Sequence, residues 1–278
     1  MPEARTIQIR VNEQPVELPI GTSLHSLWHT QKPDADLLIY NGFPVTADVT
    51  LVDGDEIVLI RRGQIPRSDE LEGLLVARHG PGVHQTLKRA HVGIAGCGGL
   101  GSTLAVALAR LGVGCLTLVD FDVVEPSNLN RQQFFIDQIG QAKVDALAAN
   151  LSRVNPYVTL SRHQLKMGGS DVARLFGSCQ VVAECFDNPA AKAELSTAMR
   201  RTLQSIPLVA VSGIAGYGPA STIRSRRVFG NHFLIGDGVT AAQPGRGLLA
   251  PKVTVAAGHQ ANVVLRLLLG AIASNEGE

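Results

Sequence analysis

The sequence predicts an α/β protein in which a mostly parallel sheet carries helices on both faces, preceded by a small β-rich domain. From residue 91 onward, apolar strand segments alternate with helical segments, which is typical of a parallel sheet. A glycine-rich run at residues 96–101 stands between the first of these strands and its helix. Residues 1–63 follow a different pattern, with short strands around a single helix.

Length and composition indicate a globular protein. The 278 residues are 45% hydrophobic and 18% charged, which is enough for one large and one small core. The net charge of +1 provides no broad field that would attract nucleic acid or an anionic membrane. The first residues contain no apolar signal segment, and no apolar run has the length of a membrane span. We therefore expect a cytoplasmic protein with neither nucleic acid nor membrane as a partner.

The N-terminal region has a recognisable order of elements. Residues 6–11 alternate apolar and polar side chains, and after an Asn-Glu turn residues 15–18 return as a second strand. The run Gly21-Thr22-Ser23 provides a candidate N-cap for a short helix over residues 24–30. Further strands follow, among them residues 36–40 and 56–60, with Asn-Gly and Asp-Gly turns between them. Two strands, a helix and then more strands is the β-grasp order.

Residues 64–90 are predicted to form a linker, because prolines and glycines interrupt the hydrophobic periodicity. The linker ends in a lead-in helix over residues 83–90. The second domain is expected to span residues 91–278. Its expected strands are residues 91–95, 115–120, 158–163, 179–186 and 207–213, and its expected helices are residues 99–112, 140–155, 170–177 and 251–270, with one more helix beginning at Pro189.

The first candidate site is the glycine run, which contains Gly96, Gly98, Gly99 and Gly101. Glycine allows the backbone to turn tightly and to approach a phosphate or a ribose closely. The following helix begins with unpaired N–H groups and the positive end of its dipole. Asp120 ends the second strand, where a carboxylate accepts hydrogen bonds from ribose hydroxyls. This combination predicts a Rossmann-like nucleotide site.

The residues after Asp120 indicate which nucleotide binds. Asn128 and Arg131 follow the second strand, and Lys143 stands near the start of the next helix. Arg131 and Lys143 together could bind the several negative charges of a polyphosphate. A dinucleotide has only a pyrophosphate, which the helix N-terminus alone can bind. The pattern therefore favours a nucleoside triphosphate over a dinucleotide-dependent oxidoreductase. That alternative would be established by tight binding of NAD(P) or FAD without binding of ATP.

A third candidate site follows the strand that contains Cys185. Asp187 is placed at the carboxyl end of this strand, where ligands bind in open α/β sheets. Because a carboxylate repels phosphates unless a cation lies between them, Asp187 predicts bound Mg²⁺. Asn188 is assigned the separate role of N-cap for the helix that begins at Pro189.

Together these motifs resemble a known family. GCGGLG, VDFDVVEPSNLNRQ, GQAK, CFDN and GLLAPKV are similar to the ThiF/MoeB/HesA enzymes, the bacterial relatives of ubiquitin-activating enzymes, from about residue 78 to the end. VSGIAGYGPA and PGRGLLAPKV resemble the shorter ThiF group, which is linked to thiamine biosynthesis. Residues 1–63, and DGDEIVLI above all, resemble the ThiS/MoaD sulfur carriers. Those carriers end in Gly-Gly, which is missing after the last strand, so we expect an appendage that packs or recruits.

The resemblance implies a role for each matching residue. Asp120 would bind the ribose of ATP, and Asp187 would hold Mg²⁺. Arg78 would reach the site from the other subunit of a homodimer. The implied catalytic residues are Asp187, Arg131, Lys143 and Arg78. The implied nucleotide-binding residues are Gly96, Gly98, Gly99, Gly101, Asp120, Asp122, Ser127, Asn128, Arg131, Lys143 and Asp187.

The resemblance implies an adenylation reaction with ATP and Mg²⁺. The C-terminal glycine carboxylate of a ThiS-type sulfur carrier would attack the α-phosphorus, giving an acyl-adenylate and pyrophosphate. Positioning and electrostatic stabilisation would account for the rate. No zinc is expected, because the Cys-x-x-Cys pairs of many relatives are missing. Cys97 and Cys185 are expected to be packed rather than nucleophilic. A molybdopterin-type carrier and a non-catalytic scaffold remain as alternatives.

Overall fold

The computed structural model describes residues 5–64, 70–71, 75, 79 and 81–272. The chain divides into two compact units, Met1–His84 and Gln85–Glu278. Helix α3 (Pro81–Arg89) spans the boundary between them. Within the described residues, no helix is both long enough and apolar enough to cross a membrane.

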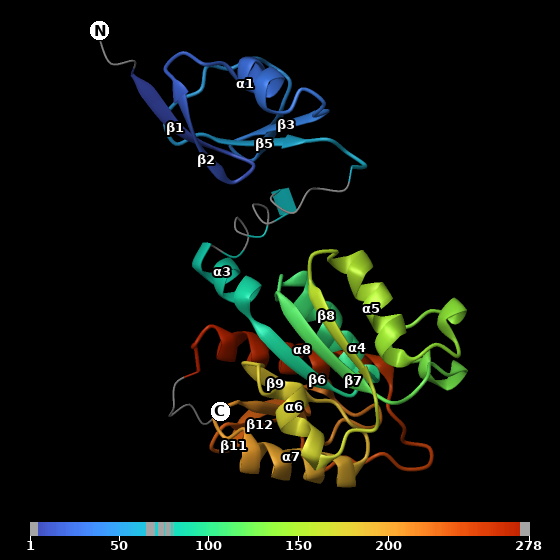
Figure 1. Cartoon of the computed structure of the whole chain (residues 1–278). Helices are drawn as coiled ribbons and strands as arrows, with labels where there is room; N and C mark the ends of the chain where they lie inside the picture. Colours follow the sequence, from blue (N-terminus) through green and yellow to red (C-terminus); the bar gives the residue numbers. More distant parts are fainter. Residues whose placement is uncertain (1–4, 65–69, 72–74, 76–78, 80, 273–278) are drawn as a thin grey trace. The chain divides into compact units, whose positions relative to one another are not determined.

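The first unit contains a five-stranded sheet with one helix, α1 (Leu24–Gln31), on it (Figure 1). The strands have the order β2-β1-β5-β3-β4, and β1 and β5 pair in parallel while the other pairs are antiparallel. Their bounds are β1 Thr6–Val11, β2 Gln14–Pro19, β3 Leu37–Tyr40, β4 Phe43–Val45 and β5 Glu56–Ile60. This is the β-grasp arrangement that the sequence predicts.

Local sequence explains the turns and the helix of this unit. Asn12 and Glu13 both have positive φ, which suits the tight turn that joins β1 to β2. The Ser23 side chain accepts the Ser26 amide at 3.3 Å and so begins α1. Alternate residues of β1 are buried against the helix, where Leu24 and Leu27 are almost fully enclosed. The predicted N-cap and strand alternation are therefore confirmed.

The second unit contains a seven-stranded sheet with the order β11-β12-β10-β9-β6-β7-β8. All neighbouring strands are parallel except β11, which pairs antiparallel with β12. The strand bounds are β6 His91–Ala95, β7 Cys115–Asp120, β8 Thr159–Gln164, β9 Val181–Glu184, β10 Leu208–Val211, β11 Arg224–Phe229 and β12 His232–Gly236. The parallel strands have the doubly wound order of Rossmann folds, in which the switch point lies between β6 and β9.

Helices cover both faces of this sheet (Figure 1). Helices α4 and α8 pack together on one face, and α6 and α7 pack together on the other. The helix bounds are α4 Gly99–Arg110, α5 Lys143–Val154, α6 Val172–Phe176, α7 Pro189–Thr202 and α8 Ala250–Leu268. The α8 side that contains Val253, Ala257 and Val264 is buried, whereas Thr254 and Val255 are exposed. The last helix is therefore buried on one side within its own unit.

Strands β11 and β12 are not among the strands predicted from the sequence. The signal for them is weak, because β11 contains three arginines and alternates only partly between buried and exposed positions. Gly230-Asn231 between the two strands is the turn dipeptide that indicates a hairpin. The two strands extend the sheet beyond β10 and leave β11 at its edge.

Candidate functional site

The glycine turn lies at the switch point of the sheet, directly after β6. Gly96 has φ +96°, and a Cβ added there would lie 2.9 Å from the Cys185 carbonyl oxygen. A Cβ on Gly101 would lie only 1.9 Å from the Gly96 carbonyl oxygen. The helix therefore starts so close to the strand that only glycine fits. Gly98 is the N-cap of α4 and provides no side-chain cap, so the first turn of α4 presents its N–H groups.

Asp120 and Lys143 belong to one hydrogen-bond network that includes a backbone amide of the glycine turn. The Asp120 carboxylate accepts the Cys97 amide at 2.6 Å and the Asp122 amide at 2.9 Å. The Lys143 Nζ atom donates to the Asp122 carboxylate at 2.8 Å. Burial raises the pKa of Asp120, although the two amides and the charge of Lys143 oppose this effect. The structure thus joins Asp120, Asp122 and Lys143.

Asn128 and Arg131 lie in the loop between β7 and α5. Asn128 is buried, and its Oδ1 atom accepts the Glu125 amide at 3.1 Å, so it caps a short 3₁₀ turn. The Arg131 Nη1 atom donates to the Ser127 carbonyl at 3.2 Å. A Cβ added to Gly99 would lie 3.3 Å from the Arg131 carbonyl oxygen, so Arg131 packs directly on the glycine turn. Asn128 and Ser127 make contacts that shape this loop.

Asp187 follows β9, on the other side of the switch point. It is exposed, and its carboxylate has no hydrogen-bond or ion-pair partner among the residues that the structure describes. Asn188 accepts the amides of Ala190 at 2.8 Å and Ala191 at 3.1 Å, which confirms its prediction as N-cap of α7. Asp187 is therefore left with an open carboxylate at the carboxyl edge of the sheet.

The predicted residues Arg131, Lys143 and Asp187 all lie beyond the carboxyl ends of β7 and β9. Strand β6 and its glycine turn stand between these two strands in the sheet. No group of three or more possible metal-binding side chains occurs in the described part of the chain. Magnesium bound to a nucleotide needs only one or two carboxylates plus phosphate oxygens, and the open carboxylate of Asp187 fits that need. Arg78 lies outside the described residues.

A buried ion pair beside Asp187 was missed in the sequence. Glu184 is 2% exposed and accepts the Lys192 ammonium at 2.9 Å on each carboxylate oxygen. Lys192 also donates to the Val211 carbonyl at 2.9 Å, and Glu184 accepts the Phe186 amide at 2.6 Å. The sequence signal for this pair is Glu184 itself, a single acid in an apolar strand. A buried carboxylate needs a partner, so its position indicates a buried cation nearby. The pair ties β9, α7 and β10 together next to Asp187.

We predict that Lys192→Met lowers the free energy of unfolding by about 3 kcal/mol at neutral pH, because it leaves Glu184 buried and unpaired. Burial raises the pKa of Glu184, and Lys192 counteracts that shift. Without Lys192, the Glu184 carboxyl group of the folded protein keeps its proton at a pH where the same group of the unfolded chain has lost it. The loss in free energy of unfolding should therefore be smaller at mildly acidic pH than at neutral pH. Urea unfolding at the two pH values measures it. The exposed Lys166→Met should change little, and an equal loss at both pH values would contradict the prediction.

The cysteines are packed. Cys97 and Cys185 are buried and free, and burial raises the pKa of both thiols well above the usual range. A thiol that resists ionisation is a poor nucleophile. Their geometry agrees with the expectation that neither is a reactive residue.

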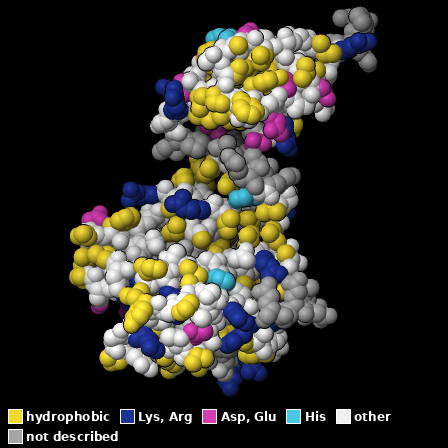
Figure 2. Space-filling model, turned by 180° about the vertical axis from the view of Figure 1, so that it is seen from behind, with side chains coloured by type: hydrophobic (Ala, Val, Ile, Leu, Met, Phe, Trp, Pro, Cys, Tyr) yellow, Lys and Arg dark blue, Asp and Glu magenta, His cyan; other side chains and the backbone are white. Residues whose placement is uncertain are grey.

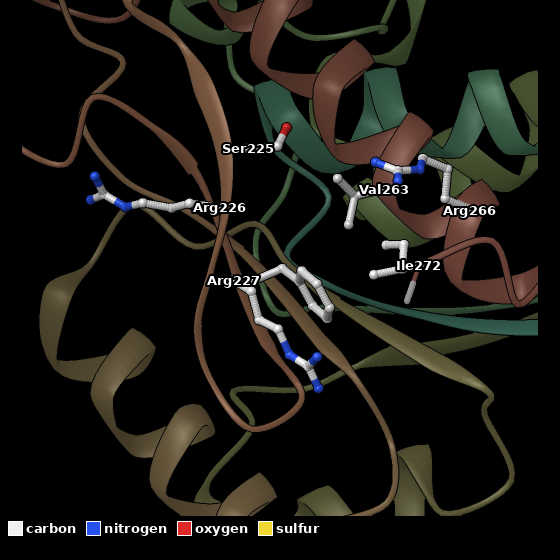
Figure 3. Close-up of a pocket in the computed structure, with 7 residues that line it drawn as sticks. Ser225, Arg226, Arg227, Val263, Arg266 and Ile272 are labelled. Atoms are coloured by element: carbon white, nitrogen blue, oxygen red, sulfur yellow. The ribbon is translucent and has the colours of Figure 1, made fainter. Parts of the chain in front are cut away.

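A small cavity lies elsewhere in this unit, between β11, β12 and α8 (Figure 3). Its volume of about 20 Å³ is room for one water molecule. In Figure 3 the Arg226 side chain points away from Val263 and Ile272, and Ser225 lies near α8. The cavity is too small for a nucleotide.

Comparison with known proteins agrees with these features. Residues 72–277 match the ThiF family, and residues 7–63 match ThiS-like ubiquitin. Molybdopterin-synthase adenylyltransferase of Escherichia coli (strain K12) is 31% identical over 197 residues, which are 67% of this chain and 76% of that protein. Adenylyltransferase and sulfurtransferase MOCS3 of Caenorhabditis briggsae is 36% identical over 149 residues, 53% of this chain and 37% of that protein.

Solved structures share the fold. The E. coli tRNA N6-threonylcarbamoyladenosine dehydratase in complex with ATP has a TM-score of 0.66 and 22% identity, covering 77% of this chain and all of that one. The E. coli MccB structure with succinimide has a TM-score of 0.57 and 21% identity, covering 77% of this chain and 74% of that one. With a family match over most of its length, the chain belongs to the ThiF family, and residues 7–63 are a ThiS-like ubiquitin domain.

Proposed function

We propose that this protein is an ATP-dependent adenylyltransferase that activates the C-terminal glycine carboxylate of a ThiS-type sulfur carrier in thiamine biosynthesis. The observation that carries the proposal is the open glycine turn after β6. Arg131 and Lys143 follow the neighbouring strand β7, and Asp187, which has no partner among the described residues, follows β9. Family membership and the name of the E. coli relative, an adenylyltransferase, support the same activity.

Each residue has a distinct part in the proposed reaction. The N–H groups of the first turn of α4 bind phosphate oxygens, and Asp120 accepts a ribose hydroxyl with its remaining lone pairs. Arg131 and Lys143 stabilise the negative charge that grows on the leaving pyrophosphate. The protein needs no nucleophile of its own, because the carrier's carboxylate attacks the α-phosphorus directly.

Asp187 is the residue that would hold Mg²⁺ in this proposal. A magnesium ion supplies positive charge that offsets the repulsion between the phosphates and the attacking carboxylate. Asp187 would hold the ion with its exposed carboxylate, which requires no rearrangement of the fold.

The domain boundaries of the proposal are residues 1–63 for the β-grasp domain, 64–90 for the linker and 91–278 for the adenylation domain. We propose that the β-grasp domain packs or recruits rather than carries sulfur. Arg61 and Arg62, which follow its last strand, contact Asp34 at 2.9 Å and Asp36 at 3.4 Å. A carrier needs a free Gly-Gly at this point. The proposal also includes a homodimer in which Arg78 acts on the partner's site.

The direct test is incubation of the full chain with ATP, Mg²⁺ and purified carriers, followed by intact-mass measurement of each carrier. A ThiS-type carrier should gain the mass of an adenylyl group, which is AMP less one water. A molybdopterin-type carrier is the second candidate, because the E. coli relative is named as the adenylyltransferase of molybdopterin synthase. Modification of that carrier alone would replace the thiamine assignment, and modification of neither would reject the proposed function.

We predict that Arg131→Ala lowers carrier-dependent ATP–pyrophosphate exchange by about 100-fold, because one charged contact to the leaving group is lost. The melting temperature should change by no more than a few degrees, since the guanidinium makes only contacts to Ser127 and Asn130 on an exposed loop. Arg162→Ala is the matched control, because Arg162 is an exposed arginine paired with Asp145. Equal exchange by the two variants would remove Arg131 from the site.

A further inference from the structure

Lys252 is a buried lysine whose charge is poorly satisfied. Its side chain is among the most enclosed of any charged residue, at 6% exposure. Within the described part of the chain, its ammonium donates only to the Ala215 carbonyl, at 3.2 Å. Lys143 and Lys192, by contrast, each lie within 3 Å of a carboxylate. An ammonium has three N–H donors, and its burial with one carbonyl is unfavourable unless a further anion binds.

No carboxylate among the described residues forms an ion pair with Lys252. Asp237 lies near enough for its charge to interact with that of Lys252, but the two residues form no ion pair in the described part of the chain. The Asp237 carboxylate instead accepts the amides of Val239 at 2.8 Å and Thr240 at 2.7 Å, together with the Thr240 hydroxyl. Asp237 therefore shapes its own loop and leaves Lys252 available.

Lys252 lies at the edge of the candidate nucleotide site. It is the third residue of α8, a helix of 19 residues whose N-cap, Leu249, provides no side-chain cap. The next residue, Val253, packs on the glycine turn, since its Cγ1 atom would lie 3.1 Å from a Cβ on Gly99. The second residue of α8, Pro251, has no N–H, so an anion site at this point would consist of the buried ammonium and the remaining N–H groups of the first turn.

The sheet order separates this point from the residues proposed to bind phosphate. Arg131 and Lys143 follow β7, on one side of β6. Ala215, the acceptor of Lys252, follows β10, which lies beyond β9 on the other side of β6. In the proposed function, the nucleotide phosphates are bound by the first turn of α4, Arg131 and Lys143. The anion that remains to be bound in the proposed reaction is the carboxylate that attacks.

We infer that Lys252 and the first turn of α8 form an oxyanion site that binds the terminal carboxylate of the incoming carrier next to the glycine turn. This inference rests on the proposed function. A fixed lysine at this position binds the carboxylate as an ion and holds it near the α-phosphorus. Lys252 is thus a substrate-binding residue, and amidation of the carrier terminus should remove its contribution.

The test compares binding of a ThiS-type carrier with binding of the same carrier amidated at its terminal glycine, in the presence of a non-hydrolysable ATP analogue. The variants are Lys252→Met, Lys252→Arg and the exposed-lysine control Lys166→Met. The wild-type chain and the control should prefer the free carboxylate by about 10-fold or more, the size expected for a hydrogen bond to a charged group. Lys252→Met should lose this preference, and Lys252→Arg should retain most of it.

Affinity for the ATP analogue alone should be equal in the wild type and in Lys252→Met. Thermal unfolding of both proteins checks the fold, which methionine should preserve because it is apolar and of similar length. An unchanged carboxylate preference in Lys252→Met would overturn the inference, as would a wild type without any preference. Loss of affinity for the ATP analogue in Lys252→Met would also overturn it, because the anion would then be a phosphate.

The outcomes separate the inference from the proposed function. Carrier adenylation by the wild type, with an unchanged preference in Lys252→Met, removes only the inference. A Lys252-dependent preference without transfer of AMP to the carrier retains the oxyanion site and removes the adenylyltransferase. Failure of the wild type to bind either form of the carrier rejects both.

Discussion

Replacement of Asp187 by alanine is expected to lower carrier-dependent ATP–pyrophosphate exchange by about 100-fold or more, because the proposed site loses the carboxylate that would hold magnesium. The fold should survive unchanged. Asp187 is exposed and has no hydrogen-bond or ion-pair partner in the described residues, so its removal breaks no contact. Exchange kinetics and thermal unfolding measure the two effects on the same preparation.

Magnesium dependence makes this prediction specific. The residual activity of Asp187→Ala should require a higher Mg²⁺ concentration than the wild type does, since the ion would then be held by phosphate oxygens alone. Asp137→Ala removes another exposed carboxylate and should leave both exchange and its Mg²⁺ dependence unchanged. If Asp187→Ala exchanges like the Asp137 control, the metal assignment is wrong.

Gly101→Ala is expected to destabilise the second unit strongly. The added Cβ would lie 1.9 Å from the Gly96 carbonyl oxygen, a backbone atom that moves only if β6 and α4 separate. Overpacking of this kind typically costs about 1–3 kcal/mol of stability and occasionally more. Binding of an ATP analogue should fall sharply as well, because the N–H groups of α4 would shift from their positions.

The matched control is Gly258→Ala, which makes the same chemical change inside α8. A Cβ at Gly258 meets no atom within 4 Å, and its φ is not positive. Alanine should therefore stabilise the helix by about 0.5–1 kcal/mol, since it restricts the unfolded chain and favours helix. Urea unfolding gives the opposite signs expected for the two variants, and calorimetry gives the nucleotide affinity. A Gly101→Ala protein that is as stable as the wild type would contradict the close-approach argument.

Local features of the fold were predictable from the sequence. Ser23 and Asn188 both cap the helices that were assigned to them, because a capping side chain reaches only two or three residues along the chain. The Asn12-Glu13 turn and the Gly96 turn likewise depend on backbone conformations that few residues adopt. The strand, glycine turn and helix from residues 91 to 110 follow from apolar periodicity, which reflects burial on one face.

Other features depend on contacts between residues that are distant in sequence. The Glu184 and Lys192 pair reaches the Val211 carbonyl only because β10 lies beside β9 in the sheet. Lys252 has the sequence context of an ordinary helix residue, yet its buried ammonium donates to the carbonyl of Ala215, 37 positions earlier in the chain. Asn128 caps its own loop, a contact that the motif alone does not distinguish from a phosphate contact.

The sequence by itself determined the order of the elements other than β11 and β12, two helix caps, the glycine turn and the family resemblance, because these depend on interactions over a few residues. Only the tertiary structure decided the order of strands, the position of β11 and β12, and the neighbours of Glu184, Arg131 and Lys252. Strand order and buried partners result from packing among segments far apart in the chain, and short-range patterns carry no information on which segments meet.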